Sequence, residues 1–354
     1  AVVNLRANVC TCKGCGYTVI HRFAVGTCFF CTFKNGNFLN GLRQGCHRLS
    51  RVHSNRIGGA MKTNSPRRHL VQFIATFMTN PHVSNFTDGT IHKGKSKSFC
   101  SPGLNCYSCP AAGAACPIGA LQSVENGNKY HISYYVMGFL LITGAFLGRF
   151  VCGFLCPFGF FQDLLYKIRV KKRRIPVKLD KALRYLKYVI LAVFVFALPI
   201  AISNEFGIGE PFFCKYICPA GTIEAGIPLL IKNESLRAMM GILFDWKMIL
   251  LIITVILSTM IYRPFCKYIC PLGAIYSFFN RFSVLQMEVD RGACINCMRC
   301  EINCDMQVKV LHNINSAECI RCGKCRSICP TSAINWTVGG KVILKSNESS
   351  RQRA

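Results

Sequence analysis

The hydrophobic positions of this chain gather into long apolar runs instead of alternating with polar ones. The runs are residues 131–150, 185–203 and 248–262. The first two approach the roughly 20 residues that cross a bilayer, and Trp246 and Lys247, which favour the membrane interface, precede the third. HLVQFIATFM, from His69, is a shorter fourth candidate. The pattern predicts a membrane α-helical bundle of about four spans over residues 61–285.

Charged residues between the runs predict the direction in which each helix crosses. Segment 166–181 holds eight Lys or Arg and one Asp, whereas 204–245 holds five acidic and three basic residues. Basic loops stay in the cytoplasm, so we expect 166–181 inside and 204–245 outside. The C-terminal region then lies in the cytoplasm, the segment at His69 must also cross, and the protein belongs to the cytoplasmic (inner) membrane.

A cysteine motif follows each apolar run. RFVCGFLCPFG, PFFCKYICPAG and RPFCKYICPLG, from residues 149, 211 and 263, place two cysteines four positions apart and a proline after the second. Proline is favoured at the first position of a helix, so the second thiolate lies at a helix N-terminus, which favours negative charge. The following Gly lets the backbone approach. The pairs are predicted ligands of anionic iron–sulfur clusters, with structural thiols or disulfides as the alternative.

The Cys-Pro-x-Gly tetrad occurs four times, at Cys116, Cys156, Cys218 and Cys270. In the expected orientation, four thiolates converge at the inner face, enough for one [4Fe–4S] cluster: Cys152, Cys156, Cys266 and Cys270. Six cysteines fall on the outer side: Cys100, Cys106, Cys109, Cys116, Cys214 and Cys218. The alternation predicts an inverted repeat with two similar cluster sites at opposite ends of the bundle. The sequence leaves open which two of the six outer cysteines are not ligands.

The C-terminal region carries two runs with the same cysteine spacing, C-x2-C-x2-C-x3-C, in CINCMRCEINC and CIRCGKCRSICP. In the bacterial ferredoxin pattern, the fourth Cys of each run ligates the other cluster. The predicted ligand sets are Cys294, Cys297, Cys300 and Cys329, and Cys319, Cys322, Cys325 and Cys304. Short strand candidates flank the runs, so residues 286–340 are predicted to form a small α+β two-cluster ferredoxin domain before a polar tail, 341–354. Zinc is the alternative metal, and Asp305 stands where the pattern usually has Pro.

Residues 1–60 differ from the rest, because they contain no Asp, Glu, Met, Pro or Trp. Four cysteines have a spacing close to that of zinc ribbons: Cys12, Cys15, Cys28 and Cys31. The other interpretation is translated upstream sequence, since the first methionine is Met61 and RIGGA precedes it. We expect translation to start at Met61, and the intact mass of the natively expressed protein tests this.

Composition narrows the class of protein. The chain has 24 cysteines in 354 residues and a mean hydropathy of +0.31. Disulfide-rich secreted domains are small, whereas tight CxxC spacing in a reducing cell indicates metal binding. The net charge of +28 does not predict a nucleic-acid partner, because basic loops in an apolar chain mark the cytoplasmic face of a membrane protein.

These motifs together resemble the NapH/NosR-type membrane-bound polyferredoxins. RFVCGFLCPFGFFQDLL, RPFCKYICPLGA and the two ferredoxin runs carry the resemblance, which covers residues 66–338. It implies an inner-membrane protein that passes electrons between the quinone pool or a cytoplasmic donor and an extracytoplasmic reductase or flavoprotein. The pair Cys214 and Cys218 and the segment CSPGLNCYSCP go beyond the shortest members.

Two functions are consistent with the motifs. The first is electron transfer through [4Fe–4S] clusters, two in the ferredoxin domain and one or two more in the membrane domain. The second is a redox-dependent assembly or regulatory factor for a metalloenzyme. The chain has no flavin motif, dinucleotide fingerprint or CxxCH haem motif, so we expect an electron-transfer subunit and not an autonomous catalyst.

Two further features concern partners. Glu224 is the one carboxylate in the apolar stretch GTIEAGIPLLI, which makes it the candidate quinone or proton site. The alternative is that it caps a helix or pairs near the membrane interface. Four basic residues near the ferredoxin runs are candidates for docking an acidic donor such as a ferredoxin or flavodoxin: Arg299, Arg321, Lys324 and Arg326. The alternative is an ordinary solvated surface that is also attracted to the membrane.

Overall fold

The computed structural model describes residues 9–11, 18–20, 66–124, 134–202, 210–238 and 240–344. It divides into two compact units, Ala1–Lys62 and Thr63–Ala354, which are described separately. In the first unit, β1 (Val9–Thr11) and β2 (Thr18–Ile20) form an antiparallel pair. The predicted zinc-ribbon cysteines, the expected start at Met61 and the tail 345–354 lie outside the described residues.

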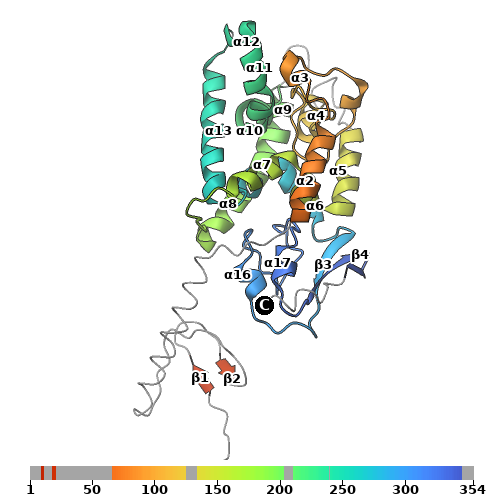
Figure 1. Ribbon diagram of the computed structural model, residues 1–354, viewed down its shortest axis with the longest axis vertical. Coiled ribbons are helices and arrows are strands. Elements are labelled where there is room, and N and C mark those ends of the chain that lie inside the picture. Colours follow the sequence, from red (N-terminus) through yellow and green to blue (C-terminus); the bar gives the residue numbers. More distant parts are fainter. Residues whose placement is uncertain are drawn as a thin grey trace, which may run out of the picture. The chain divides into compact units, whose positions relative to one another are not determined.

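The second unit begins with a helical part, residues 66–279, drawn in Figure 1. Its first helices are α2 (Pro66–Thr79), α3 (Asn85–Asp88), η1 (Lys95–Ser98), α4 (Pro117–Val124), α5 (Tyr134–Leu147), α6 (Phe150–Phe154), α7 (Pro157–Tyr166) and α8 (Val177–Ile190). Then come η2 (Leu191–Ala197), α9 (Leu198–Ala201), η3 (Phe213–Ile217), α10 (Pro219–Gly221), η4 (Thr222–Gly226), α11 (Ile227–Lys232) and α12 (Glu234–Ala238). The last are α13 (Ile242–Met260), α14 (Pro264–Tyr268) and α15 (Pro271–Phe279).

Two helices of the described chain are long and apolar enough to cross a membrane. They are Val177–Ala201, which joins α8, η2 and α9 over 25 residues, and Ile242–Met260 with 19. The expected span 131–150 is interrupted, because Gly148 adopts φ 53° and ends α5. The fourth candidate, α2, has 14 residues and measures about 21 Å, less than the roughly 30 Å of a bilayer core.

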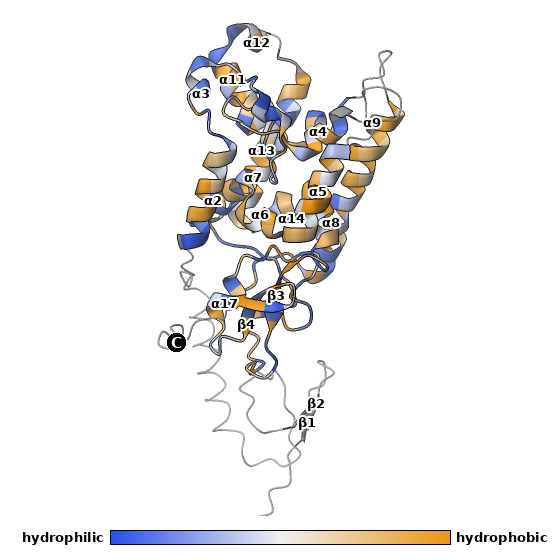
Figure 2. Ribbon diagram, turned by 90° about the vertical axis from the view of Figure 1, so that its right-hand side faces the viewer, coloured by the Kyte–Doolittle hydropathy of each residue, from blue (hydrophilic) through white to orange (hydrophobic). Residues whose placement is uncertain are grey.

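Figure 2 colours long stretches of the helices as hydrophobic. Many of the large apolar side chains on these helices are exposed. Phe73 on α2, Ile142 on α5 and Ile252 on α13 are each at least half exposed. Soluble monomers rarely expose contiguous apolar surface on this scale. The outward faces are therefore chemically suited to lipid.

The chain ends in a ferredoxin part, residues 285–344, which contains the predicted strands. β3 (Leu285–Val289), β4 (Ile334–Val338) and β5 (Lys341–Leu344) form an antiparallel sheet in that order. The short helices α16 (Arg299–Ile302) and α17 (Lys324–Ile328) each begin within a cysteine run. Met287 lies opposite Trp336 in the register, and both side chains are buried against Cys300 in one small core.

Candidate iron–sulfur centres

Site C consists of Cys152, Cys156, Cys266 and Cys270. All four side chains are buried. The thiol of Cys270 interacts electrostatically with those of Cys152, Cys156 and Cys266. The Nε2 atom of Gln162 donates a hydrogen bond to the Cys266 sulfur over 3.0 Å. The structure therefore brings together the four thiols that the sequence assigned to one cluster.

The two Cys-Pro-x-Gly tetrads of site C share one local geometry. Cys156 and Cys270 are the N-cap residues of α7 and α15, and each is followed by proline at the first helical position. The glycine amide donates to the cysteine sulfur over 3.4 Å, from Gly159 to Cys156 and from Gly273 to Cys270. A helix N-terminus thus offers both N–H donors and its positive dipole end to the sulfur, which stabilises a thiolate ligand.

Two buried arginines hold the backbone around site C. Arg263 forms an ion pair with Asp163, with 2.7 Å from Nε to Oδ1, and its Nη1 donates to the Cys152 carbonyl. Arg149 donates to the Cys266 carbonyl over 3.2 Å. Both arginine side chains are fully buried. The segments that carry the ligand pairs are therefore fixed to each other by charge-assisted hydrogen bonds.

Site D consists of Cys106, Cys116, Cys214 and Cys218. The thiol of Cys214 interacts electrostatically with those of Cys106, Cys116 and Cys218. Of the six outer cysteines, Cys100 and Cys109 lie outside this group: Cys100 pairs with Ala115 in a β-bridge and Cys109 packs among alanines. The neighbours of Cys214 favour these four thiols as the candidate ligands, although Cys100 interacts with Cys116 and Cys109 packs against Cys106.

Glu224 lies against site D. Its Oε2 accepts a hydrogen bond from the Cys106 amide over 2.6 Å. Burial raises the pKa of the Glu224 carboxyl to about 7, against the lowering effect of that amide. The carboxylate that the sequence singled out therefore fixes the backbone of a candidate ligand.

Sites C and D are adjacent, and the expectation of sites at opposite ends of the bundle is wrong. The Leu104 amide donates to the Cys156 sulfur over 3.4 Å, and the next amide, of Asn105, contacts the Cys116 sulfur. Since consecutive residues are 3.8 Å apart, these two sulfurs lie within about 11 Å of each other. The physical reason is the segment before Cys106, where Gly103 approaches Cys156 so closely that a Cβ would lie 2.7 Å from its Cα.

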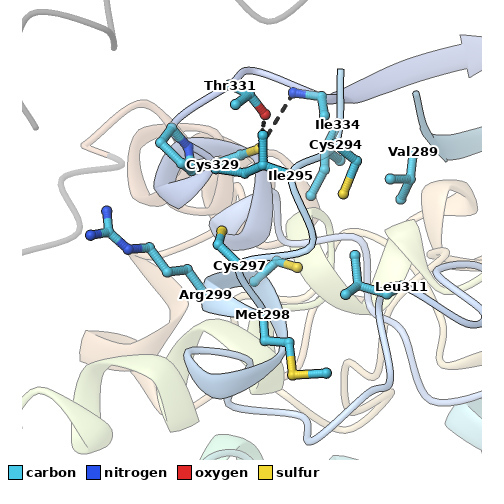
Figure 3. A pocket seen from close by; sticks show the side chains of 13 residues that line it. Val289, Cys294, Ile295, Cys297, Met298, Arg299, Leu311, Cys329, Thr331 and Ile334 are labelled. Carbon is cyan, nitrogen blue, oxygen red and sulfur yellow. Dashed lines mark hydrogen bonds between the residues drawn. The ribbon is translucent and has the colours of Figure 1, made fainter. Parts of the chain in front are cut away.

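Sites A and B occupy the ferredoxin part. Site B consists of Cys304, Cys319, Cys322 and Cys325. The thiol of Cys325 interacts electrostatically with the other three thiols. Site A consists of Cys294, Cys297, Cys300 and Cys329, which line one small pocket (Figure 3). These are the two sets with an exchanged fourth cysteine that the spacing predicts; that they ligate clusters remains a prediction.

The two runs repeat in the backbone with an offset of 25 residues. Three pairs of equivalent positions have positive φ: Asn296 and Arg321, Met298 and Gly323, Gln307 and Ser332. The left-handed conformation is uncommon outside glycine and turns the chain sharply. The runs therefore fold as two copies of one ligand loop. Asp305, where the pattern usually has Pro, forms an ion pair with Lys324 at 2.7 Å.

Site B contacts site C through backbone. A Cβ on Gly153, which follows Cys152, would lie 2.3 Å from the carbonyl oxygen of Ile320, which follows Cys319. Only glycine permits this approach. The two residues join a ligand of one site to a ligand of the other.

A buried network fixes the ferredoxin part on the helical part. The Glu318 carboxylate accepts from Arg149 at 2.9 Å and pairs with Lys187 at 2.6 Å. The Asn280 side chain accepts from the Arg149 amide and donates to the carbonyls of Ser316 and Cys319. Separating the two parts would leave buried charges without their partners, which is strongly destabilising, so the network holds the two parts together.

The residues fit [4Fe–4S] clusters. All 18 cysteines of the described residues between 66 and 344 are free thiols. Among those same residues, no three His, Cys, Asp or Glu are grouped for a single metal ion, and a cubane separates its thiolates more widely than one ion does. Burial raises the pKa of the Cys319 thiol to about 12, and iron supplies the positive charge that makes such a sulfur a thiolate. Beside site D, the buried side-chain amide of Asn105 and the hydroxyl of Thr222 have no partner in the described structure, so they are free to donate to a bound group.

Sequence reasoning missed the residues that support the ligands. Gly153 is a variable position between Cys152 and Cys156, and Gln162 and Asn280 follow the CPxG tetrads, so the cysteine spacing assigns a role to none of them. Their signal is polar or small character among apolar residues. The expected docking surface is wrong for Arg321, which is fully buried, while Lys324 is engaged with Asp305. Arg299 is exposed.

Comparison with known proteins adds the family. The 4Fe-4S binding domain family matches residues 132–176, 188–232 and 246–287, each with one CxxxCP pair, and a second family of the same description matches 312–335. No solved structure matches.

Three relatives are similar to this chain over more than half of its length. The uncharacterized protein MJ0749 of Methanocaldococcus jannaschii is 31% identical over 64% of this chain and 80% of the relative. The ferredoxin-type protein NapH of Escherichia coli is 24% identical over 64% of this chain and 76% of its own length. The putative electron transport protein YccM of Escherichia coli is 24% identical over 61% of this chain and 57% of its own length. The chain therefore belongs to the polyferredoxin-type 4Fe-4S proteins.

Proposed function

We propose that this chain is a membrane electron-transfer protein whose four sites, A to D, form one path. The observation that carries the proposal is the unbroken series of contacts between the sites. Exchanged cysteines join A to B, Gly153 and Ile320 join B to C, and Leu104 and Asn105 join C to D. Electron tunnelling weakens steeply with distance, so adjacent sites favour transfer along the chain.

The protein's own groups would set the properties of the path. When bound, the clusters supply one-electron chemistry. Amides of Gly159, Gly273 and Leu104 donate to ligand sulfurs, and such bonds tune reduction potentials. Burial of site C excludes water from its sulfurs, and Cys116 and Cys218 of site D are buried too, whereas Cys297 of site A is exposed. Site A is thus the accessible end for a partner.

The proposed location is the inner membrane, in several passes, with the ferredoxin part in the cytoplasm. The apolar outward faces and the basic segment 166–181 support this orientation. The partners would be a cytoplasmic ferredoxin-like donor or the quinone pool on one side and an extracytoplasmic flavoprotein or reductase on the other. The alternative is a redox-dependent assembly or regulatory factor, which would use the same sites.

Iron and acid-labile sulfide per chain test the path. We expect about 16 irons in the full chain purified anaerobically in detergent, for four [4Fe–4S] clusters. A content of about 8 would mean that only the ferredoxin part is loaded. The path would then be wrong, and the assembly-factor function would be favoured.

A quinone site beside site D is a further part of the proposal. Glu224 is the carboxylate at this end of the path. We expect Glu224→Gln to slow reduction of the clusters by a quinol while reduction by dithionite keeps its rate. Unchanged quinol kinetics would leave Glu224 with only its structural contact to Cys106.

A further inference from the structure

The buried basic side chains divide into two groups. Six lie below one-tenth exposure in the described residues: Lys97, Arg149, Lys187, Arg263, Lys267 and Arg321. Four of them pair with a carboxylate: Arg149 and Lys187 with Glu318, Arg263 with Asp163, and Lys267 with Asp180. Within the described chain, Lys97 and Arg321 have no carboxylate partner. A buried charge is costly unless it is compensated, so these two require an explanation.

Arg321 lies between two ligands of site B, in the run Cys319-Ile320-Arg321-Cys322. Its guanidinium is fully buried, donating to the carbonyls of Leu147 over 2.9 Å and Asn280 over 2.5 Å, while its Nε has no partner in the described structure. Among the described residues, the acidic group that interacts electrostatically with this guanidinium is the Cys319 thiol. The charge is therefore held by neutral carbonyls on one side and faces a cluster ligand on the other.

The repeat makes this position distinctive. Arg321 has φ 53°, and its equivalent in the first run is Asn296, with φ 52°. Asn is enriched in the left-handed region because its short polar side chain can hydrogen-bond locally, whereas Arg has no such advantage there. Asn296 is exposed, but Arg321 reaches into the helical part. The second copy of the loop therefore carries a charged contact that the first lacks.

Lys97 shows the same arrangement at site D. Its ammonium donates to the Tyr107 carbonyl over 2.7 Å, and its acidic electrostatic neighbours are the thiols Cys109 and Cys106. Each of the two buried cations without a carboxylate thus lies beside a ligand of a proposed cluster. A cluster held by four thiolates is a net anion, and reduction makes it more negative.

We propose that Arg321 has the anionic cluster of site B as its counter-charge, and that this interaction raises the reduction potential of that cluster while fastening the ferredoxin part to the helical part. The inference depends on the proposed loading of site B. Each electron that arrives adds negative charge beside the guanidinium, so reduction strengthens the contact. Arg321 is a tuning and positioning residue, not a ligand.

A redox titration followed by EPR, on the full chain purified anaerobically, tests the proposal. The site B signal is the one lost in Cys322→Ser. We expect Arg321→Gln to lower the reduced-to-oxidised ratio of site B at least tenfold at a given potential, a shift of about 59 mV to more negative values for one electron. Arg321→Lys keeps the charge, so its shift should be less than half as large. Lys97→Gln should shift site D in the same direction.

Arg281→Gln is the matched control, because it removes one exposed positive charge next to Asn280. It should leave the site B potential unchanged. Loss of site B iron from the Gln variant but not from the Lys variant supports the counter-charge. Loss from both, or a loaded Gln variant with the wild-type potential, overturns it. A chain with about 8 irons refutes the four-site path but still carries site B, so the two failures are distinguishable.

Discussion

Replacing Gly153 by Ala should separate sites B and C. The added Cβ would lie 2.3 Å from the Ile320 carbonyl oxygen, and carbon–oxygen contacts rarely fall below roughly 3.3 Å. The backbones must therefore part by about 1 Å. Backbone cannot rotate away as a flexible side chain can, so we expect an overpacking cost of about 1–3 kcal/mol.

Hydrogen exchange measures this cost at the contact. A loss of 1–3 kcal/mol corresponds to amide exchange about 5- to 150-fold faster in residues 311–323. The magnetic interaction between reduced sites B and C in EPR spectra should weaken, since it falls with distance. Gly138→Ala is the control, because nothing lies within 4 Å of its added Cβ. If exchange and magnetic interaction in Gly153→Ala match the wild type, the close contact does not connect the sites.

Two other changes test the buried network and the assignment of ligands. Glu318→Gln leaves the buried Arg149 without a carboxylate and should cost roughly 3–5 kcal/mol in the free energy of unfolding, measured by hydrogen exchange, whereas Glu234→Gln at an exposed pair should cause no change. Equal effects would show that Glu318 is not part of a specific contact. Cys106→Ser should remove about four irons per chain and Cys109→Ser none, measured by iron analysis. Equal losses would contradict the assignment of site D.

The sequence predicts the ligand loops well because their chemistry is local. CPxG fixes a proline and a helix N-terminus within four residues, and the ferredoxin runs contain their own turns. The cysteines of sites A, B and C therefore come together as predicted, while their role as cluster ligands stays a prediction. The spacing does not predict which distant segments of the chain contact each other. Gly103 brings its segment into the bundle through a contact with Cys156, 53 positions along the chain, and no periodicity records such an approach.

The same limit explains the helices and the charges. The run 131–150 reads as continuous, but Gly148 faces Asn280 and Arg321 and ends α5 there. Arg321 reads as a surface cation in the sequence, and only its carbonyl partners reveal that it is buried. Long-range packing determines where α5 ends and whether Arg321 is buried, whereas the hydrophobic pattern alone predicts α13.

The grouping of the cysteines has a consequence for biogenesis. Each site collects thiols from segments that are synthesised at different times, and site A is incomplete until Cys329 has been made. A loaded cluster therefore acts as a cross-link that closes long loops, and such closure restricts the unfolded chain more than the folded one. If the sites are loaded as proposed, iron limitation would leave the chain without these cross-links and lower its stability. The supply of iron and sulfide during synthesis would thus determine how much of the protein accumulates.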